Sequence, residues 1–315
     1  MRHISLVTTV KNEAGSARDL IEAVRRQSRP PGEWVVVDGG STDGTAELFA
    51  AEPSCRLLRA PGNIAHGRNV AISHAKGDLI AVTDGGCRPA PDWLALLIEP
   101  LAADRADITA GASVPHIHGP FDIAQWALLD QLVMPSMPFR KPALSSRSLA
   151  FRREVWEHTA YPEWLDHGED TWVIRAWVGA GRRLERVPEA EVEWRLRGSV
   201  AAFLAQHFRY MRGDGRARLH GRRHLVRFAF YGGLTGLFLW SAVARPWAAV
   251  AGAGLWLTYL AASAARLLPL LPGRGFGCAI RSLAWLPPLL LAMDVAKVVG
   301  YLRGRLDPGP GRRAP

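Results

Sequence analysis

The sequence has few cysteines and lacks the short motifs that mark several common enzyme classes. Its three cysteines, at positions 55, 87 and 278, are odd in number and show no CxxC spacing. This argues against a disulfide framework and a cysteine-rich zinc site, and favours a reducing compartment. No GxGxxG follows the first apolar run, and neither GxxxxGKS nor GxxxxGKT occurs. A nicotinamide-dependent enzyme and a P-loop protein are therefore not expected.

Excess positive charge is missing from the first two-thirds of the chain, although the net charge is +10. Residues 1–205 carry 23 basic and 26 acidic side chains, 206–226 carry six Arg and one Asp, and 227–315 carry ten basic and two acidic side chains. The excess therefore lies beside or within an apolar region, where anionic lipid headgroups attract Arg and Lys. We expect a membrane and no nucleic acid among the partners.

The C-terminal third contains long runs without charge. Residues 228–244 and 246–265 are uncharged, and Arg245 separates them. At about 1.5 Å per residue each run can cross about 30 Å of hydrocarbon, although the first only just reaches this length. A soluble helix rarely lacks charge for about five turns. The pattern predicts a transmembrane hairpin rather than two buried helices of a soluble domain.

A third apolar segment, about 279–301, is a poorer span because it contains Pro287, Pro288, Asp294 and Lys297. The Arg-rich flanks of the hairpin should be cytoplasmic, and a full third crossing would leave the basic tail, 303–315, outside. We therefore expect a Pro-kinked re-entrant or interfacial segment. The amino terminus shows no signal-peptide pattern. The expected location is the inner or plasma membrane, with the N-terminal domain on the cytoplasmic side.

The 315 residues suggest two domain-sized units, and the first alternates β-rich runs with helical periodicity. Strands are expected at 3–10, 34–38, 55–59, 78–83 and 107–114, and helices at 15–28, 46–50, 64–75 and 91–103. Asp43 or Ser41 would cap the second helix. This alternation favours an α/β fold with a mostly parallel sheet covered on both faces. In such sheets, ligands bind beyond the carboxyl ends of the strands.

Four motifs follow one another along residues 1–225. They are SLVTTVKNEAG, VVVDGGSTDGT, GRNVAISHAKGDLIAVTDGGC and GEDTWVIRAW. Together they resemble a family-2 inverting glycosyltransferase with the GT-A fold, a Rossmann-like catalytic domain. The resemblance implies transfer of a sugar from a nucleotide-diphosphate donor to a lipid-linked or polymer acceptor. The expected division is a GT-A domain at 1–198, an interfacial helix and basic collar at 199–226, a membrane region at 227–302 and a basic tail.

The resemblance also implies which residues hold the donor. The nucleotide-sugar site would include Thr9, Glu13, Asp38, Arg68 and Asp84. Asp38 would accept hydrogen bonds from the base or the ribose, or instead cap the turn that follows it. Arg68 would border the nucleotide, or instead lie on a solvated helix face. Where the family often has an aromatic residue that stacks on the base, this sequence has Lys11, which leaves a cation over the base as the alternative.

The metal and base motifs are retained only in part. In the family a DxD motif holds a divalent cation, and here Asp84 is present while Gly86 replaces the second acid. Mg²⁺ or Mn²⁺ can still bind through one carboxylate, waters and phosphates, so metal dependence is expected. The resemblance assigns the general base to Asp170, with Glu169 in support. The alternatives are a helix-dipole role for both carboxylates and His167 as the base.

Residues 199–211 have the apolar spacing of an amphipathic helix at a membrane surface. Gln206, Arg209 and Tyr210 resemble part of a signature of membrane-bound synthases in the family, with departures at His207 and Tyr210. They would lie near the acceptor and the leaving diphosphate. Binding of anionic lipid by a basic collar is the alternative.

A second function class stays open beside the enzyme. The chain would then be a catalytically silent membrane scaffold or sugar-nucleotide sensor of the same fold. Gly86 favours this hypothesis, whereas Asp84, Glu169 and Asp170 oppose it.

Overall fold

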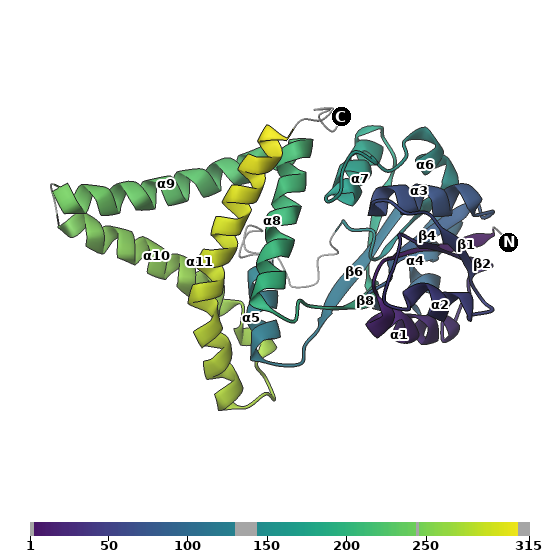
Figure 1. Cartoon of the computed structure of the whole chain (residues 1–315), viewed down its shortest axis with the longest axis horizontal. Helices are drawn as coiled ribbons and strands as arrows, with labels where there is room; N and C mark the ends of the chain where they lie inside the picture. The colour runs from purple at the N-terminus through teal and green to yellow at the C-terminus, as the bar shows by residue number, and fades with distance from the viewer. Residues whose placement is uncertain (1–2, 130–143, 244–245, 308–315) are drawn as a thin grey trace. The chain divides into compact units, whose positions relative to one another are not determined.

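A computed structural model describes residues 3–129, 144–243 and 246–307 of the chain (Figure 1). The chain divides into two compact units. Among the described residues, the first comprises 3–115 and 144–195, and the second comprises 116–129, 196–243 and 246–307. Arg245 of the expected hairpin turn and residues 308–315 of the expected basic tail lie outside the described residues.

The first unit is built on a mixed sheet, whose eight strands among the described residues have the order β3-β2-β1-β4-β7-β6-β8-β5. The parallel part consists of β1 (Ile4–Val10), β2 (Glu33–Asp38), β3 (Arg56–Arg59) and β4 (Leu79–Asp84). The antiparallel pairs involve β5 (Cys87–Pro89), β6 (Ile108–His116), β7 (Leu149–Arg152) and β8 (Leu184–Arg195). The α/β prediction is confirmed, and antiparallel strands extend the sheet beyond β4.

Apolar runs explain why the central strands are buried on both faces. Val7, Val35, Val37, Ile80 and Val82 are all fully buried in one core, as is typical of parallel strands between helical layers. The helices of this unit are α1 (Ala14–Arg25), α2 (Thr45–Ala50), α3 (Ile64–His74), α4 (Trp93–Ala102), α6 (Arg153–His158) and α7 (Glu169–Gly179). Each strand and helix predicted from the sequence has its counterpart, with boundaries that shift by a few residues.

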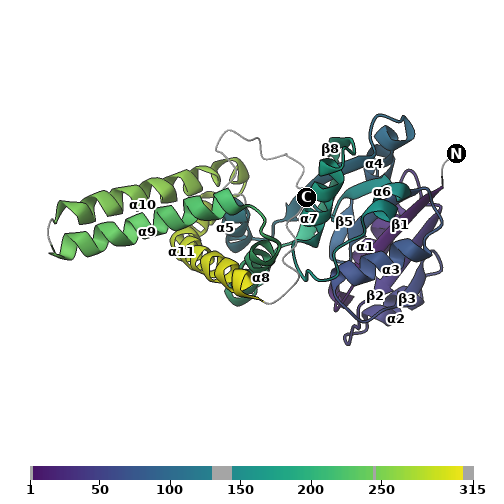
Figure 2. The ribbon, with the colours of Figure 1, turned by 90° about the horizontal axis from the view of Figure 1, so that it is seen from above.

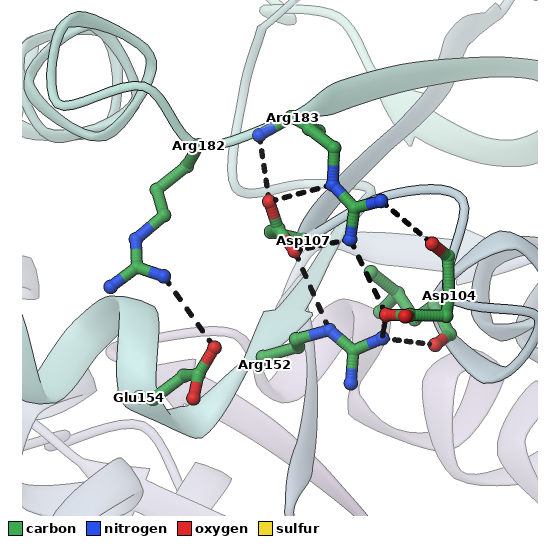
Figure 3. A network of polar contacts seen from close by, with 7 residues as sticks. Asp104, Asp107, Arg152, Glu154, Arg182 and Arg183 are labelled. Carbon is green, nitrogen blue, oxygen red and sulfur yellow. Dashed lines mark hydrogen bonds and ion pairs between the residues drawn. The ribbon is translucent and has the colours of Figure 1, made fainter.

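A cluster of Arg and Asp side chains holds the sheet together at the amino end of β4 (Figure 3). Arg152 of β7 lies beside Leu79 in register and donates a hydrogen bond of 2.6 Å to Asp104. Arg183 donates to Asp107 at 2.9 Å, and hydrogen bonds from Arg183 keep the pKa of Asp107 below its usual range. Because this cluster lies at the opposite end of β4 from Asp84, its role is to stabilise the fold.

The second unit is helical and contains α5 (Pro120–Leu129), α8 (Val200–Ala217), α9 (Gly221–Val243), α10 (Trp247–Ala265) and α11 (Phe276–Leu306), with a short 3₁₀ turn at Leu268–Leu270. Helices α9 and α10 lie side by side as a hairpin (Figure 2). Three helical stretches, Gly221–Val243, Trp247–Leu270 and Phe276–Leu306, are long and apolar enough to cross a membrane. The first two stretches each contain an apolar window of 18 residues, of which only 11% and 17%, respectively, is buried. Such exposure is expected for helices that face lipid.

The third apolar segment forms α11, one helix of 31 residues that contains Pro287 and Pro288. The kink at these prolines and the re-entrant or interfacial position stay predictions. A proline costs a helix one backbone hydrogen bond, and packing against neighbouring helices offsets this loss. Leu286, Leu289 and Leu290, which flank the prolines, are buried in the core of the second unit.

Helices α8 and α11 approach each other closely because glycines line their contact. A Cβ atom at Gly300 would meet the carbonyl oxygen of Phe208 at 2.4 Å, and one at Gly304 would meet that of Arg212 at 2.0 Å. On the other helix, a Cβ at Gly215 would meet the carbonyl oxygen of Tyr301 at 2.2 Å. The spacing of Gly300 and Gly304 is that of the small-residue pairs that allow close packing of apolar helices.

Candidate active site

The carboxyl ends of three neighbouring strands bring predicted site residues to one edge of the sheet. Thr9 of β1 lies in register with Asp84 of β4, and Val10 lies in register with Asp38 of β2. Helix α3 approaches the same edge because Gly67 has no side chain, and a Cβ there would lie 3.1 Å from Thr9 Cγ2. The buried Oγ1 of Thr9 has no hydrogen-bond partner among the described residues.

Arg68 of α3 is the centre of this edge. Its side chain is buried, with 1% of the residue exposed. Nη1 donates to Glu169 Oε1 at 2.5 Å, and Nη2 donates to Asp84 Oδ1 at 2.7 Å. The guanidinium carbon lies 5.4 Å from the centre of the Tyr161 ring. The alternative of a solvated helix-face Arg is therefore wrong, and Arg68 is a buried bridge between β4 and α7.

The charges of this bridge are mutually dependent. Burial, followed by the charge of Asp170, raises the pKa of Glu169 to about 7, although Arg68 opposes the shift. Burial disfavours the charge of Arg68, but Asp84 and Glu169 hold the pKa of Arg68 above its usual value. Arg68 therefore stays charged, while Glu169 titrates near neutral pH.

Asp170 differs from its neighbour in exposure. It is half-buried, and its oxygens accept hydrogen bonds from the backbone amides of Thr171 at 2.6 Å and Ser146 at 3.3 Å. Adjacent residues of a helix point in different directions, and here Glu169 points to Arg68. Of the two carboxylates, Asp170 is the one that keeps contact with solvent.

The acids at this edge suit a hard divalent cation. Asp84 is partly exposed, at 24% of its side chain. A Cβ at Gly86 would lie 3.3 Å from Glu13 Oε2, so the Glu13 carboxylate lies where a second acid of the DxD motif would begin. Among the described residues, no group of three or more His, Cys, Asp or Glu side chains is arranged to hold a metal ion. A cation held by these carboxylates, with its other ligands from waters and phosphates, stays a prediction.

Asp38 is engaged in its own turn. It is 3% exposed, and its carboxylate accepts hydrogen bonds from Gly40 N at 3.1 Å, Ser41 N at 3.1 Å and Ser41 Oγ at 2.5 Å. This is the turn cap that the sequence left open as the alternative, and a contact of Asp38 with a nucleotide stays a prediction. The carboxylate of Asp43 accepts a hydrogen bond from Thr45 N at 3.1 Å, as expected for a residue that caps α2. The N-cap position itself is occupied by Gly44.

Hydrogen bonds that the sequence analysis did not predict join the loops after β1 and β2. Three consecutive backbone amides, those of Asn12, Glu13 and Ala14, donate to the side chains of Ser41 at 2.9 Å, Thr45 at 2.8 Å and Asp43 at 3.0 Å, respectively. In return, Asn12 Oδ1 accepts from Thr42 N at 2.9 Å. Asn12 adopts a positive φ of 55°, which Asn tolerates better than most residues. The sequence signal for these bonds is the set of short polar side chains in NEA, residues 12–14, and in STDGT, residues 41–45.

Asn69, which follows Arg68 on α3, bonds to the segment before α7. Its Nδ2 donates to Tyr161 O and Glu163 Oε1, both at 2.9 Å, and its Oδ1 accepts from Trp156 Nε1 and Tyr161 N. These bonds hold the segment before α7 against α3. Asn69 therefore positions the chain that leads to the Glu169–Asp170 pair.

The predicted acceptor residues belong to α8 in the second unit. Gln206 is 5% exposed and donates to Tyr210 Oη at 2.8 Å, one turn away. Arg209 is exposed on a different face of the helix. The three residues are thus divided between two faces of α8, and their role toward an acceptor stays a prediction.

Comparison of the sequence with known proteins finds similar glycosyltransferases. Residues 5–158 match the family described as Glycosyl transferase family 2. Glycosyltransferase AglE of Haloferax volcanii is 26% identical over 55% of this chain, and the match spans 60% of that relative. Succinoglycan biosynthesis protein ExoA of Rhizobium meliloti is 28% identical over 86% of this chain and 93% of its own length.

A solved structure shows the same fold. The mannosyltransferase PcManGT of Pyrobaculum calidifontis, in complex with GDP-Man and Mn²⁺, superposes with a TM-score of 0.55 at 21% identity, covering 96% of this chain and 87% of that chain. Residues 5–158 match glycosyl transferase family 2, and this match, together with the similar glycosyltransferases, supports the resemblance that the sequence motifs indicated.

Proposed function

We propose that the protein transfers a sugar, with inversion, from a nucleotide-diphosphate sugar to a lipid-linked or membrane-associated acceptor. The observation that carries this proposal is the partly exposed Asp170 beside the buried bridge of Asp84, Arg68 and Glu169. Asp84 lies at the carboxyl end of the parallel strand β4, within the residues that match glycosyl transferase family 2, and Arg68 joins it to the start of α7. This arrangement offers a base on one side and a diphosphate-binding edge on the other.

In the proposed reaction, the acceptor hydroxyl gives its proton to an Asp170 oxygen as its own oxygen attacks the anomeric carbon. The bond from that carbon to the donor phosphate oxygen breaks, and its electron pair leaves with the nucleoside diphosphate. A single in-line displacement of this kind inverts the anomeric configuration. Glu169 and Arg68 fix the start of α7, and with it the position of Asp170.

On the donor side, Thr9, Asp38 and Glu13 would line the nucleotide-sugar site. Asp84, with Glu13 beside Gly86, would hold a divalent cation, which supplies positive charge to the leaving diphosphate. The complex of PcManGT with GDP-Man and Mn²⁺ supports this expectation by analogy of fold.

The second unit supports a membrane-associated acceptor. Three helical stretches that could cross a membrane follow the catalytic domain, and one relative is named for the biosynthesis of a polysaccharide. We place the protein in the inner or plasma membrane with its catalytic domain at the cytoplasmic face. The Arg-rich segment before α9 supports this orientation.

Hydrolysis of sugar nucleotides without an acceptor would test the activity. Full-length protein in detergent is incubated with UDP- and GDP-sugars and Mn²⁺, and ¹H NMR follows the anomeric proton. We expect slow release of a sugar from one donor, with the anomer first formed inverted relative to that donor. Release of the retained anomer would refute the mechanism. Binding of a sugar nucleotide without hydrolysis or transfer to any membrane extract would favour the silent scaffold.

We expect Asp84→Ala to abolish the metal-dependent part of the stabilisation by a nucleoside diphosphate. A ligand that binds only the native state raises its melting temperature, so thermal shifts with and without Mn²⁺ measure the effect. Gly86→Asp should lower the melting temperature without metal, because its carboxylate would face Glu13, and Mn²⁺ should restore it. Unchanged metal-dependent stabilisation in Asp84→Ala would show that Asp84 is not a cation ligand.

A further inference from the structure

The second unit contains a group of buried basic side chains contributed by three helices. His207 of α8, Arg227 of α9 and Lys297 of α11 are 3%, 3% and 5% exposed. Burial, and then the charges of Lys297 and Arg227, lower the pKa of His207 to about 2. The imidazole is therefore neutral, and both cations lie close enough to influence it. We refer to these three residues as the basic cluster.

Several polar atoms of the basic cluster lack hydrogen-bond partners among the described residues. Arg227 Nη1 lies 3.0 Å from His224 Nδ1, but Nε is 3.7 Å from Asp294 Oδ1, beyond hydrogen-bond distance. Among the described residues, Arg227 Nε, Arg227 Nη2 and His207 Nε2 are buried without a hydrogen-bond partner. A buried donor without a partner costs about 1–3 kcal/mol, so a ligand that brings acceptor oxygens would be favoured here.

The nearby carboxylates are already occupied. Asp294 Oδ2 accepts hydrogen bonds from Tyr231 Oη at 2.5 Å and Tyr259 Oη at 2.8 Å. Asp214 Oδ2 lies 3.2 Å from a ring nitrogen of His220 and from one of His224, and 3.7 Å from Arg223. Asp294 therefore has one oxygen already bound by two hydroxyls, and its other oxygen lies 3.7 Å from Arg227 Nε.

The position of the basic cluster in the sequence indicates the kind of anion. Arg227 lies in the second turn of α9, directly after the Arg-rich segment and before the apolar part of the helix. In a bilayer that begins at the apolar part of α9, Arg227 would lie at the level of the lipid headgroups. On the same helices, Leu225 and Val226 of α9 and Val295 and Val299 of α11 are at least half exposed, and they offer apolar surface to a lipid chain.

We propose that the basic cluster of His207, Arg227 and Lys297 binds the phosphate of a lipid phosphomonoester. A phosphomonoester carries up to two negative charges and three terminal oxygens, and these oxygens can accept from the unpartnered Nε and Nη2 of Arg227. That this lipid is the sugar acceptor rests on the proposed function. The binding site itself does not depend on it.

Lipid titrations of the full-length protein in phosphatidylcholine nanodiscs test the proposal. Phosphatidic acid is the probe, and phosphatidylglycerol, a phosphodiester, and inorganic phosphate are the comparison ligands. Affinity is read from the melting temperature as a function of ligand. We expect phosphatidic acid to bind about tenfold or more tightly than either comparison ligand, as one or two added charge-assisted hydrogen bonds would give.

Variants identify the residues. Arg227→Gln should weaken the binding of phosphatidic acid by about tenfold to a hundredfold, whereas Arg222→Gln, which removes the same charge from an exposed position of α9, should leave it unchanged. His207→Leu, which removes a donor but no charge, provides a second variant if Arg227→Gln does not fold. Equal loss in Arg222→Gln, or no loss in both Arg227→Gln and His207→Leu, would overturn the proposal.

Binding and catalysis can fail independently in these experiments. Loss of selective lipid binding with normal sugar transfer would refute the lipid site and leave the proposed function standing. Selective binding of phosphatidic acid in a protein that transfers no sugar would refute the proposed function and leave the site standing.

Discussion

Asp170→Asn is expected to reduce sugar transfer by about 10²–10⁴-fold, the usual loss when a general base is removed. The amide keeps the volume of the side chain but cannot take the proton of the acceptor. Donor binding should stay within a few-fold of the wild type, because Asp170 lies on α7 and the donor residues lie on the strand ends and α3. Initial rates with saturating donor, together with thermal shifts by a nucleoside diphosphate, measure both quantities.

Asp166→Asn is the matched control, because Asp166 is an exposed carboxylate four residues earlier in the chain. It should retain nearly full activity. If Asp170→Asn kept more than about a tenth of the wild-type rate, the assignment of the base would be wrong. Glu169 and His167 would then be the next residues to replace.

Arg68→Met is expected to cost about 3–5 kcal/mol in the free energy of unfolding, because removing one partner of a buried ion pair leaves its charge uncompensated. Asp84 and Glu169 would both lose the cation that holds them. Arg105→Met removes a more exposed ion-pair network with Glu99 and Glu185 and should change stability little. Thermal and denaturant unfolding of both variants give the comparison.

The effect of Arg68→Met should depend on pH. Glu169 has a pKa of about 7 in the folded protein, above its ordinary value of 4.5, so the folded state binds more protons than the unfolded state between these values. As pH rises from 4.5 to about 7, ionisation of Glu169 therefore lowers the free energy of unfolding. Arg68 limits this loss of stability because its charge favours the ionised carboxylate. The variant should be destabilised more at about pH 8.5 than at about pH 6. A loss independent of pH would mean that Glu169 is not the group that depends on Arg68.

The sequence predicted the strands and their chemistry better than it predicted the contacts between elements. Runs such as WVVVD and DLIAVT identify buried strands because apolar periodicity is a local property of the chain. The polar residues after these runs were correctly placed at the strand ends for the same reason. Asp38 and Asp84 lie where that pattern predicted them.

The sequence did not predict the burial of Arg68. This burial depends on Asp84, 16 residues away, and on Glu169, 101 residues away, and no local pattern encodes such pairing. The same applies to His207 and Asp214 of α8, which are buried. The glycines at 300 and 304 allow α11 to pack closely against α8, and their importance appears only when the two helices lie together.

The hydrogen bonds between the loops after β1 and β2 have a consequence for how phosphate can be held. In many nucleotide-binding folds, free amides at the first helix N-terminus receive the phosphate, aided by the helix dipole. Here the amides of Asn12, Glu13 and Ala14 are donated to Ser41, Thr45 and Asp43 instead. Three amides at the start of α1 are therefore bound by the protein's own side chains and do not face a ligand. Under the proposed function, the diphosphate charge of the donor would be met by cations, and chelation should weaken nucleotide binding itself before it slows catalysis.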